Sequence, residues 1–564
     1  MKFNDIPYAR PDLEKTQTDM LALKEAFLKA ETFEEQWEKM SEMNKIRKDI
    51  QTMAALVSIR HSINTLDPFY EKENEVMDEM EPQLEKLNMM FYDLLLESPF
   101  LKEFEERLGE YFFERMRLVR KTFSEEIMEE LAKENRLATE YQKLLAAAQI
   151  EFQGEKYTLS GIQIFFESPD RDVRKSAQEA MWSYFEEHAE KFDDIYDQLV
   201  SLRHSMAVKL GYENFVQMGY DRWGRTDYGP KEVAGYREGV KKFLVPLASE
   251  IFEKQRERLG FESLNYYDLP FTFPSGNPMP QGDKDQLVSA AVKMYDEMAP
   301  ETGSFFRMMV ERELLDLKQK KGKAPGGYCN FIENEKVPFI FSNFNGTSAD
   351  VDVLTHEFGH AFQVYQARDI PMPEQRFPGM ESAEIHSMGM EFLAYPWMKN
   401  FFGEDTQKYY YSHQTGTLTF IPYGVLVDAF QHYVYENPQA TPQERKAKWR
   451  ELEKEFNPWK DYTGNDFLES GGRWQLQAHI YAVPFYYIDY TLAQVVAMQI
   501  FLRMQKEDPA LWQDYLAICK VGGTLPFLSI LKEGHFENPF DEAVVEATVE
   551  GLQKSLAGFD HLSL

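Results

Sequence analysis

Residues 168–211 read SPDRDVRKSAQEAMWSYFEEHAEKFDDIYDQLVSLRHSMAVKLG, and this stretch decides the fold class. Its apolar residues recur every three or four positions, which is the spacing of one face of an α-helix. These residues are Trp182, Phe185, Ala189, Phe192, Tyr196, Leu199, Leu202, Met206 and Leu210. Ser168 suits an N-cap, Pro169 suits the first helical position and Gly211 suits a helix end. We therefore predict one long helix across the stretch.

The same pattern extends in both directions along the chain. Segments 12–30, 31–62, 71–97 and 101–119 are rich in Leu, Met, Phe, Glu and Lys, and each predicts a helix. Residues 269–282 contain four prolines and predict a long loop. Residues 324–347 place Gly and Pro around short aromatic runs, which predicts a small β-sheet. Helical patterns resume after residue 350, so the expected fold is mostly α with one small β-sheet.

The chain has 564 residues, more than a single hydrophobic core usually supports. We predict an N-terminal helical lobe over residues 1–200 and a catalytic lobe over residues 201–564. A hydrophobic content of 43% excludes a disordered chain. The formal net charge of −32 argues against nucleic acid and anionic membranes as partners, because both bind clustered Lys and Arg.

The cysteine count indicates a reducing compartment. Cys329 and Cys519 are the two cysteines, too few for a disulfide framework or a cysteine-rich zinc site. The N-terminal residues show no apolar segment of the kind that a signal peptide needs, and no run approaches 18 apolar residues. A cytoplasmic location is the expectation.

The residues that carry chemistry are His356-Glu357-Phe358-Gly359-His360. On a helix, histidines four residues apart lie on one face, where both imidazoles can bind one zinc ion. Glu357, beside them, can accept a proton from zinc-bound water. The alternative is two surface histidines on an ordinary helix.

A third metal ligand is available downstream. The Pro-rich loop 369–380 allows the chain to turn back, and the helix predicted after it offers Glu381, Glu384 and Glu391. Glu384 and Glu391 are seven residues apart and share a helix face, but spacing alone leaves Glu381 open as a ligand. Asp352, four residues before His356, is a candidate for orienting a ligand imidazole.

Three segments in this order resemble the M3 family of metallopeptidases, which includes thimet oligopeptidase and oligoendopeptidase F. They are KQKKGKAPGGYCNF (318–331), HEFGHAF (356–362) followed by ESAEIHSMGMEF (381–392), and RWQLQAHIYAVPFYYIDYTLAQ (473–494). The chain looks most like the compact Pz-peptidase type of the oligoendopeptidase F branch. The resemblance implies two helical lobes that enclose a deep substrate channel.

Carried over residue by residue, the resemblance makes His356, His360 and Glu384 the ligands of one zinc ion per chain. It makes Glu357 the general base and Glu391 an acid that supports the metal site, while Glu381 stays in reserve as third ligand. His386 is expected to pack or to hydrogen bond rather than to bind metal.

His479 and the nearby tyrosines are expected to stabilise the oxyanion of peptide hydrolysis. We favour His479, Tyr486 and Tyr490, with Tyr487 as the substitute, because the family has one His and two functional Tyr in this segment. Composition alone would favour a plain aromatic core helix.

The segment 339–347 is expected to be an edge strand to which an extended peptide adds. Gly326 and Gly327 would allow the backbone to approach closely. The function expected from all of these features is zinc-dependent endopeptidase hydrolysis of short oligopeptides. One alternative is a non-catalytic peptide-binding protein. Another is a zinc carboxypeptidase, which would need a cation such as Arg473 or Lys336 to hold the substrate carboxylate.

Overall fold

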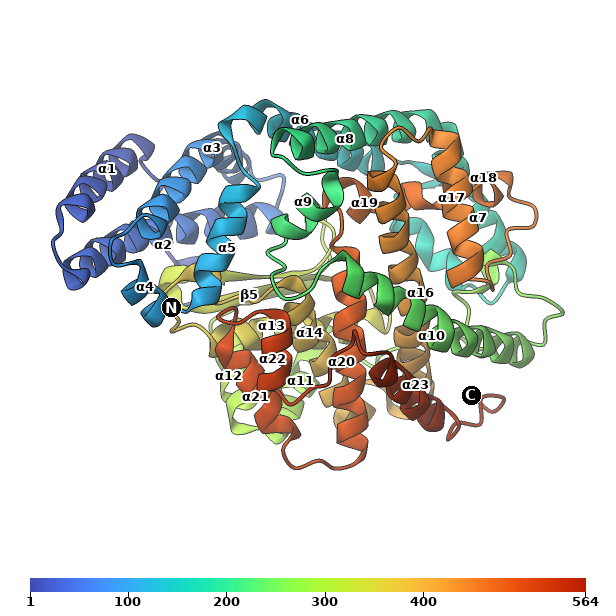
Figure 1. Ribbon diagram of the computed structural model, residues 1–564. Helices are drawn as coiled ribbons and strands as arrows, with labels where there is room; N and C mark the ends of the chain where they lie inside the picture. Colours follow the sequence, from blue (N-terminus) through green and yellow to red (C-terminus); the bar gives the residue numbers. More distant parts are fainter. The chain divides into compact units, whose positions relative to one another are not determined.

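The computed structural model describes residues 1–564, and helices dominate it (Figure 1). It contains 23 α-helices and two small sheets, so the prediction of a mostly α fold is confirmed. No helix combines the length and the apolar character needed to cross a membrane.

The chain folds into two compact units, each assembled from three separate stretches. Unit 1 comprises Met1–Arg120, Met279–Glu404 and Arg503–Phe536. Unit 2 comprises Lys121–Pro278, Asp405–Leu502 and Glu537–Leu564. Residue 200, where the sequence analysis placed the boundary between lobes, lies inside helix α8 (Ala189–Lys209) and inside unit 2.

Unit 1 begins with helices that match the predicted segments closely. Its helices are α1 (Leu13–Lys29), α2 (Phe33–Ile63), α3 (Pro68–Leu96), α4 (Leu101–Leu108), α5 (Glu110–Lys121), α11 (Lys284–Met298), α12 (Pro300–Glu311), α13 (Ala349–Gln366), α14 (Met380–Leu393), α15 (Lys399–Phe402), α21 (Leu511–Val521) and α22 (Phe527–Glu533). The helix predicted over 101–119 is two helices, because Gly109 between α4 and α5 adopts a left-handed φ of 88°.

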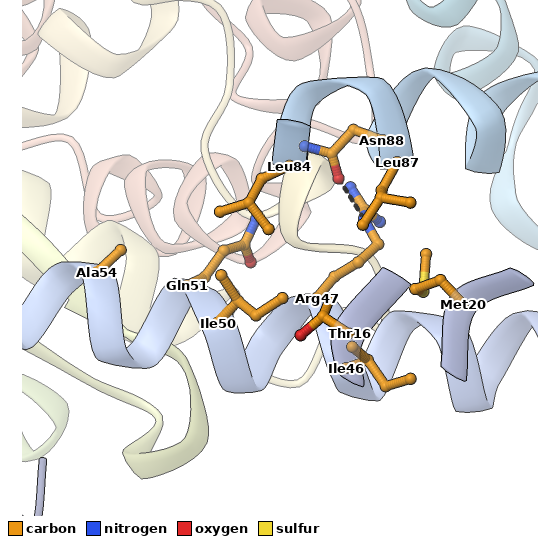
Figure 2. A pocket seen from close by; sticks show the side chains of 10 residues that line it. All are labelled: Thr16, Met20, Ile46, Arg47, Ile50, Gln51, Ala54, Leu84, Leu87 and Asn88. Atoms are coloured by element: carbon orange, nitrogen blue, oxygen red, sulfur yellow. Dashed lines mark hydrogen bonds between the residues drawn. The ribbon is translucent and has the colours of Figure 1, made fainter. Parts of the chain in front are cut away.

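A cavity of about 140 Å³ lies between α1, α2 and α3 (Figure 2). Most of its lining is apolar. Arg47 and Asn88 also line it, and Arg47 Nε donates a hydrogen bond to Asn88 Oδ1 at 2.9 Å. None of the residues that line it belongs to the motifs singled out in the sequence.

The sheet of unit 1 has the order β3–β5–β4. Its strands are β3 (Leu315–Lys318), β4 (Tyr328–Ile332) and β5 (Val337–Phe344). β4 pairs antiparallel with β5, and β3 pairs parallel with it. The sheet predicted within 324–347 is confirmed, but the expectation of an edge strand at 339–347 is wrong. β5 is the central strand with both edges paired, so a peptide cannot add to it.

Unit 2 is also helical. Its helices are α6 (Met128–Ala146), α7 (Arg171–Glu187), α8, α9 (Phe215–Arg222), α10 (Pro230–Leu259), α16 (Thr406–Glu436), α17 (Pro442–Phe456), α18 (Asp466–Glu469), α19 (Ala478–Ala482), α20 (Tyr487–Gln505) and α23 (Glu542–Leu556). A hairpin of β1 (Ile150–Phe152) and β2 (Glu155–Tyr157), which the sequence analysis did not anticipate, completes it.

The stretch 168–211 is two helices rather than the single helix predicted. Asp170, not Ser168, is the N-cap, and its carboxylate accepts hydrogen bonds from the Asp172 and Val173 amides. His188 interrupts the helix with φ −107° and ψ 8°. The buried apolar face nevertheless continues across the break, where the Phe185 and Phe192 rings stack with centroids 5.3 Å apart.

Candidate active site

Helices α13 and α14 of unit 1 carry the HExxH motif and the glutamates that follow it. They pack backbone to backbone at Gly359, where a Cβ atom would lie 2.3 Å from the His386 carbonyl oxygen. Only glycine permits this approach. On the same helix, the Phe358 ring stacks on Tyr295 with centroids 3.6 Å apart. The two helices are therefore held at a fixed separation.

This packing brings together His356, His360 and Glu384. One donor atom from each lies within 4.8 Å of the others. Glu384 Oε2 is 3.3 Å from His356 Nε2 and 3.4 Å from His360 Nε2. Tetrahedral ligands with zinc bonds of about 2.0 Å are separated by about 3.3 Å. Two imidazoles and one carboxylate at these separations fit a zinc ion with one coordination position left open.

Two further side chains orient these ligands. Glu391 Oε1 lies 2.7 Å from His356 Nδ1, and Ser387 Oγ donates to Glu384 Oε2 at 2.8 Å. With Nδ1 donating its hydrogen to Glu391, the His356 Nε2 lone pair faces the donor set. Glu391 is thus the carboxylate that orients His356 through its Nδ1 atom.

The charges within the donor set stabilise one another. Burial lowers the pKa of His356, but Glu384 and Glu391 outweigh it and hold that pKa well above its usual value. Burial likewise opposes ionisation of Glu384, yet the two histidines keep its pKa well below the usual range. A bound cation would take the place of the imidazole protons.

The other candidates near the motif lie outside this donor set. The Glu381 carboxylate folds back on the start of α14, where a Cβ on Gly379 would meet its Oε1 at 2.6 Å. His386 is fully buried, packs on the Tyr515 ring and has its pKa lowered to about 4 by burial. Neither belongs to the group of three donors.

The surroundings of the Glu357 carboxylate suit a general base. Its side chain is buried, and its Oε2 atom has no hydrogen-bond partner. Burial raises its pKa, although the two histidines act in the opposite direction. A buried carboxylate oxygen without a partner is costly, so this atom indicates a water or substrate position beside the donor set.

Gly327, ahead of β4, lies directly over this part of α13. A Cβ on Gly327 would lie 3.3 Å from Val353 Cγ1 and 3.6 Å from Glu357 Oε1. Gly326 has a left-handed φ of 91°. Gly327 makes the close approach expected of this glycine pair and encloses Glu357 on one side, whereas a Cβ on Gly326 would have no atom within 4 Å.

In unit 2, the predicted His479 and tyrosines form one cluster. The His479 ring centroid is 5.7 Å from that of Tyr486, 4.9 Å from that of Tyr487 and 6.0 Å from that of Tyr490. Tyr486 lies just before α20 and stacks on Trp223, while Tyr487 and Tyr490 lie on its first turn. All three tyrosines adjoin His479, so proximity alone does not select two of them.

A chain of hydrogen bonds sets which His479 nitrogen carries a hydrogen. Tyr423 Oη donates to Gln477 Oε1 at 2.8 Å, which directs the amide nitrogen of Gln477 at His479 Nδ1, 2.7 Å away. An amide nitrogen only donates, so Nδ1 accepts and neutral His479 carries its hydrogen on Nε2. His479 Nε2 is therefore a hydrogen-bond donor.

A buried ion pair anchors the tyrosine segment. Arg225 Nη2 donates to the Phe485 carbonyl and to Asp489 Oδ1, both at 2.6 Å. Phe485 adopts a left-handed φ of 65°, which sets the direction in which the chain enters α20. Rotation of the tyrosines as a group is restrained by these contacts.

The sequence reasoning missed Gly359, Ser387, Tyr423 and Gln477. Gly359 lies inside the quoted motif, and a glycine within a helix is itself a signal of close packing. Ser387, one turn after Glu384, faces it by helical spacing. No local signal connects Tyr423 with Gln477, because they are 54 residues apart.

The comparisons with known proteins cover most of the chain. The model of Peptidase family M3 matches residues 164–275 and 281–550, and the Peptidase M3 N-terminal domain matches residues 3–123. Oligopeptidase PepF of Bacillus subtilis (strain 168) is 21% identical over 71% of this chain. The matched region covers 59% of the length of PepF. The structure titled PZ peptidase A with inhibitor 2 is 51% identical, with a TM-score of 0.95 over 100% of both chains. Oligoendopeptidase-F from Enterococcus faecium, at 14% identity, shares the fold over 98% of this chain and 96% of its own with a TM-score of 0.64.

Proposed function

The chain belongs to peptidase family M3, and we propose that it is a zinc-dependent endopeptidase that hydrolyses short oligopeptides. The observation that carries the proposal is the donor set of His356, His360 and Glu384, whose separations suit one tetrahedral zinc ion. Bound there, zinc would supply Lewis-acid polarisation and make water more acidic.

The protein's own groups would perform the proton transfers. Glu357, buried beside the donor set, would accept a proton from the attacking water and return it to the leaving amine. Its raised pKa favours this exchange, because a base with a pKa nearer neutrality can both take and give a proton.

His479, Tyr486 and Tyr490 are the proposed donors to the oxyanion. His479 Nε2 carries a hydrogen because Gln477 occupies Nδ1, and a tyrosine hydroxyl is a donor at neutral pH. Donors of this kind stabilise negative charge that develops only in the transition state.

Short oligopeptides are the proposed substrates, supported by the names of two relatives, oligopeptidase PepF and a putative oligoendopeptidase F that is 49% identical to this chain. We propose that they bind as extended chains in a substrate channel, as the family resemblance implies. Cys329 and Cys519 are both free thiols, which supports a reducing, cytoplasmic setting.

The alternative of a non-catalytic peptide-binding protein has no support at the site, because Glu357 and all three donors are present together. For a carboxypeptidase, Lys336 is unsuitable as the carboxylate anchor. Its side chain is exposed and its Nζ lies 2.6 Å from Asp369 Oδ1.

Metal removal tests the proposal. Protein dialysed against a chelator should lose peptide hydrolysis, and zinc should restore it at one equivalent per chain, with cobalt and manganese as comparison metals. Glu384→Ala should lower the zinc content, whereas Glu381→Ala, the matched control one turn away, should leave it nearly intact. Full activity of the metal-free protein would refute the proposal, and zinc loss in Glu381→Ala alone would move the third ligand.

A further inference from the structure

His479 lies on α19, a helix too short to be stable by itself. Isolated helices shorter than about 12 residues are marginal in water, and α19 has five residues. The Val483 amide closes its turn by donating a hydrogen bond to the His479 carbonyl. The position of His479 therefore depends on groups outside α19.

The sequence after α19 leaves two of its carbonyl groups without a donor from the helix. The Ile480 carbonyl would accept from the residue four positions on, but that residue is Pro484, which has no N–H. The Tyr481 carbonyl would accept from the Phe485 amide, but that amide donates to Gln431 Oε1 at 2.9 Å. Both carbonyls belong to buried residues, so each requires another donor.

Arg203, a fully buried residue of α8, faces both of these carbonyls. Its Nη2 donates to the Tyr481 carbonyl at 2.5 Å, and its Nη1 lies 3.5 Å from the Ile480 carbonyl oxygen. A cation at the C-terminal end of a helix also interacts favourably with the helix dipole. Arg203 thus binds the end of α19 through the two residues that follow His479.

The Arg203 guanidinium is itself held in one orientation. Its Nε donates to Glu134 Oε1 at 2.6 Å, and its Nη1 donates to Tyr435 Oη at 2.8 Å. Arg222 Nη1 donates to Glu134 Oε2 at 3.1 Å. Burial raises the pKa of Glu134, but Arg203 and Arg222 outweigh it and keep that pKa below its usual value. Side chains from α6, α9 and α16 therefore fix the group that binds α19.

Two buried arginines hold the two halves of the His479 and tyrosine cluster. Arg225 binds the segment that leads into α20, through the Phe485 carbonyl and the Asp489 carboxylate. Arg203 binds the preceding segment, which carries His479. Gln477 cannot replace Arg203 in this role, because it lies two residues before His479 in the same segment. It orients the imidazole within the segment, whereas Arg203 holds the segment on α8.

We infer that Arg203 is a positioning residue, which holds α19 where His479 Nε2 can donate to the oxyanion. The inference rests on the proposed function, because it takes His479 to be an oxyanion donor. Displacement of a catalytic group by about 1 Å can cost roughly a hundredfold in rate. A planar guanidinium can contact two carbonyls, a carboxylate and a hydroxyl at once, and an ammonium cannot reproduce that geometry. Arg203→Lys should therefore keep the charge and displace α19.

The test compares Arg203→Lys with Arg174→Lys, a matched change within unit 2. Arg174, on α7, is also fully buried, and it donates to Asp268 Oδ1 at 3.0 Å and to the Ser168 carbonyl at 2.6 Å. Both variants should lower the melting temperature. Only Arg203→Lys should lower kcat for peptide hydrolysis, by roughly ten- to a hundredfold, with KM and zinc content unchanged. Kinetics are measured on zinc-loaded protein well below both melting temperatures.

A double-mutant cycle with His479→Ala separates positioning from a general effect on the fold. Arg203→Lys should lower kcat when His479 is present and have little further effect in His479→Ala, because the donor that it positions is then absent. A purely structural role would lower kcat by the same factor in both backgrounds. If Arg203→Lys does not fold, Glu134→Gln takes its place, because it keeps the size of the side chain and removes the charge that Arg203 binds. Its effect on kcat should be smaller and should again require His479.

The outcomes separate this inference from the proposed function. A kcat that is unchanged in Arg203→Lys, lowered equally in Arg174→Lys, or lowered by the same factor with and without His479 would overturn the positioning role and leave the peptidase proposal standing. The same holds for an unchanged kcat in Glu134→Gln where that variant is the one tested. A normal kcat in His479→Ala would overturn the inference together with the oxyanion role of His479. Absence of peptide cleavage by the unmodified, zinc-loaded protein would overturn the peptidase proposal itself.

Discussion

The donor set of unit 1 and the tyrosine cluster of unit 2 are positioned in different ways. His356, His360 and Glu384 are held by backbone packing at Gly359, and their separations already match those of zinc ligands. His479 is held by a hydrogen bond from its neighbour Gln477, which in turn accepts a hydrogen bond from Tyr423, 54 residues away in the sequence. Packing between two helices positions the metal donors, whereas side-chain hydrogen bonds position His479.

This difference has a mechanistic consequence. A metal site requires donors within a few tenths of an ångström, which rigid helices provide. Oxyanion donors act only when charge develops on the substrate, and three tyrosines around His479 offer more hydroxyls than one oxyanion needs. We therefore expect the loss of one metal donor in unit 1 to be more damaging than the loss of one tyrosine hydroxyl in unit 2.

The largest effect is expected from Glu357→Gln, which keeps the size of the side chain but cannot accept the proton. The value of kcat should fall by roughly 10²- to 10⁴-fold, while zinc content and peptide binding are retained. Steady-state kinetics and metal analysis of the same preparation measure this. Near-normal turnover would show that another group is the base.

Tyr490→Phe should have a smaller effect, because it removes one hydroxyl and leaves the ring packing in place. We expect kcat to fall by roughly tenfold to a thousandfold with little change in KM. Tyr486→Phe should resemble it, and Tyr487→Phe is the matched control. A silent Tyr490→Phe beside an impaired Tyr487→Phe would keep the mechanism and exchange the residues.

If all three variants keep normal kcat, tyrosine stabilisation of the oxyanion is wrong for this enzyme. His479→Ala also tests whether this cluster stabilises the oxyanion or serves only as an aromatic core. As an oxyanion donor it should lower kcat, whereas as part of an aromatic core it should lower the melting temperature and leave kcat unchanged.

Glu391→Ala tests how far the metal site depends on the carboxylate behind His356. Loss of a group that orients a ligand imidazole typically costs about 10- to 100-fold in metal affinity or activity. Competition with a chelator of known affinity measures the change. Zinc affinity equal to that of the unmodified protein would show that α13 orients His356 without help.

Gly359→Ala tests the backbone contact itself and should have the smallest effect. The added methyl group would lie 2.3 Å from the His386 carbonyl oxygen, so α13 and α14 must separate. We expect the free energy of unfolding to fall by about 1–3 kcal/mol, measured by denaturant titration.

The matched control is Gly235→Ala on α10, an exposed helical glycine with no atom within 4 Å of its added Cβ. Because alanine is the better helix former, this variant should gain up to about 1 kcal/mol. Equal shifts in the two variants would contradict the view that close helix packing builds the metal site.

The same contrast explains what could be predicted from the sequence. The HExxH pair and Glu384 lie on two consecutive helices, so spacing and family resemblance together located them. Helical periodicity was similarly informative, yet it hid the break at His188 because the apolar face continues across it. The spacing of apolar residues indicates which side chains are buried. At His188 the helix is interrupted, but the side chains on both sides of the break stay buried.

Contacts distant in sequence could not be found in that way. β5 was expected at an edge because its partner β3, at 315–318, precedes the segment with sheet-like composition. The contact between Tyr423 and Gln477 depends on how α16 packs, which no local pattern encodes.

The central claim is that His356, His360 and Glu384 bind one zinc ion. Anomalous diffraction from crystals of the purified protein at the zinc absorption edge tests it most directly. We expect one strong peak per chain, about 2.0–2.2 Å from His356 Nε2, His360 Nε2 and a Glu384 oxygen. A zinc-loaded crystal with no peak at these atoms, or with its peak at another group of side chains, would contradict it.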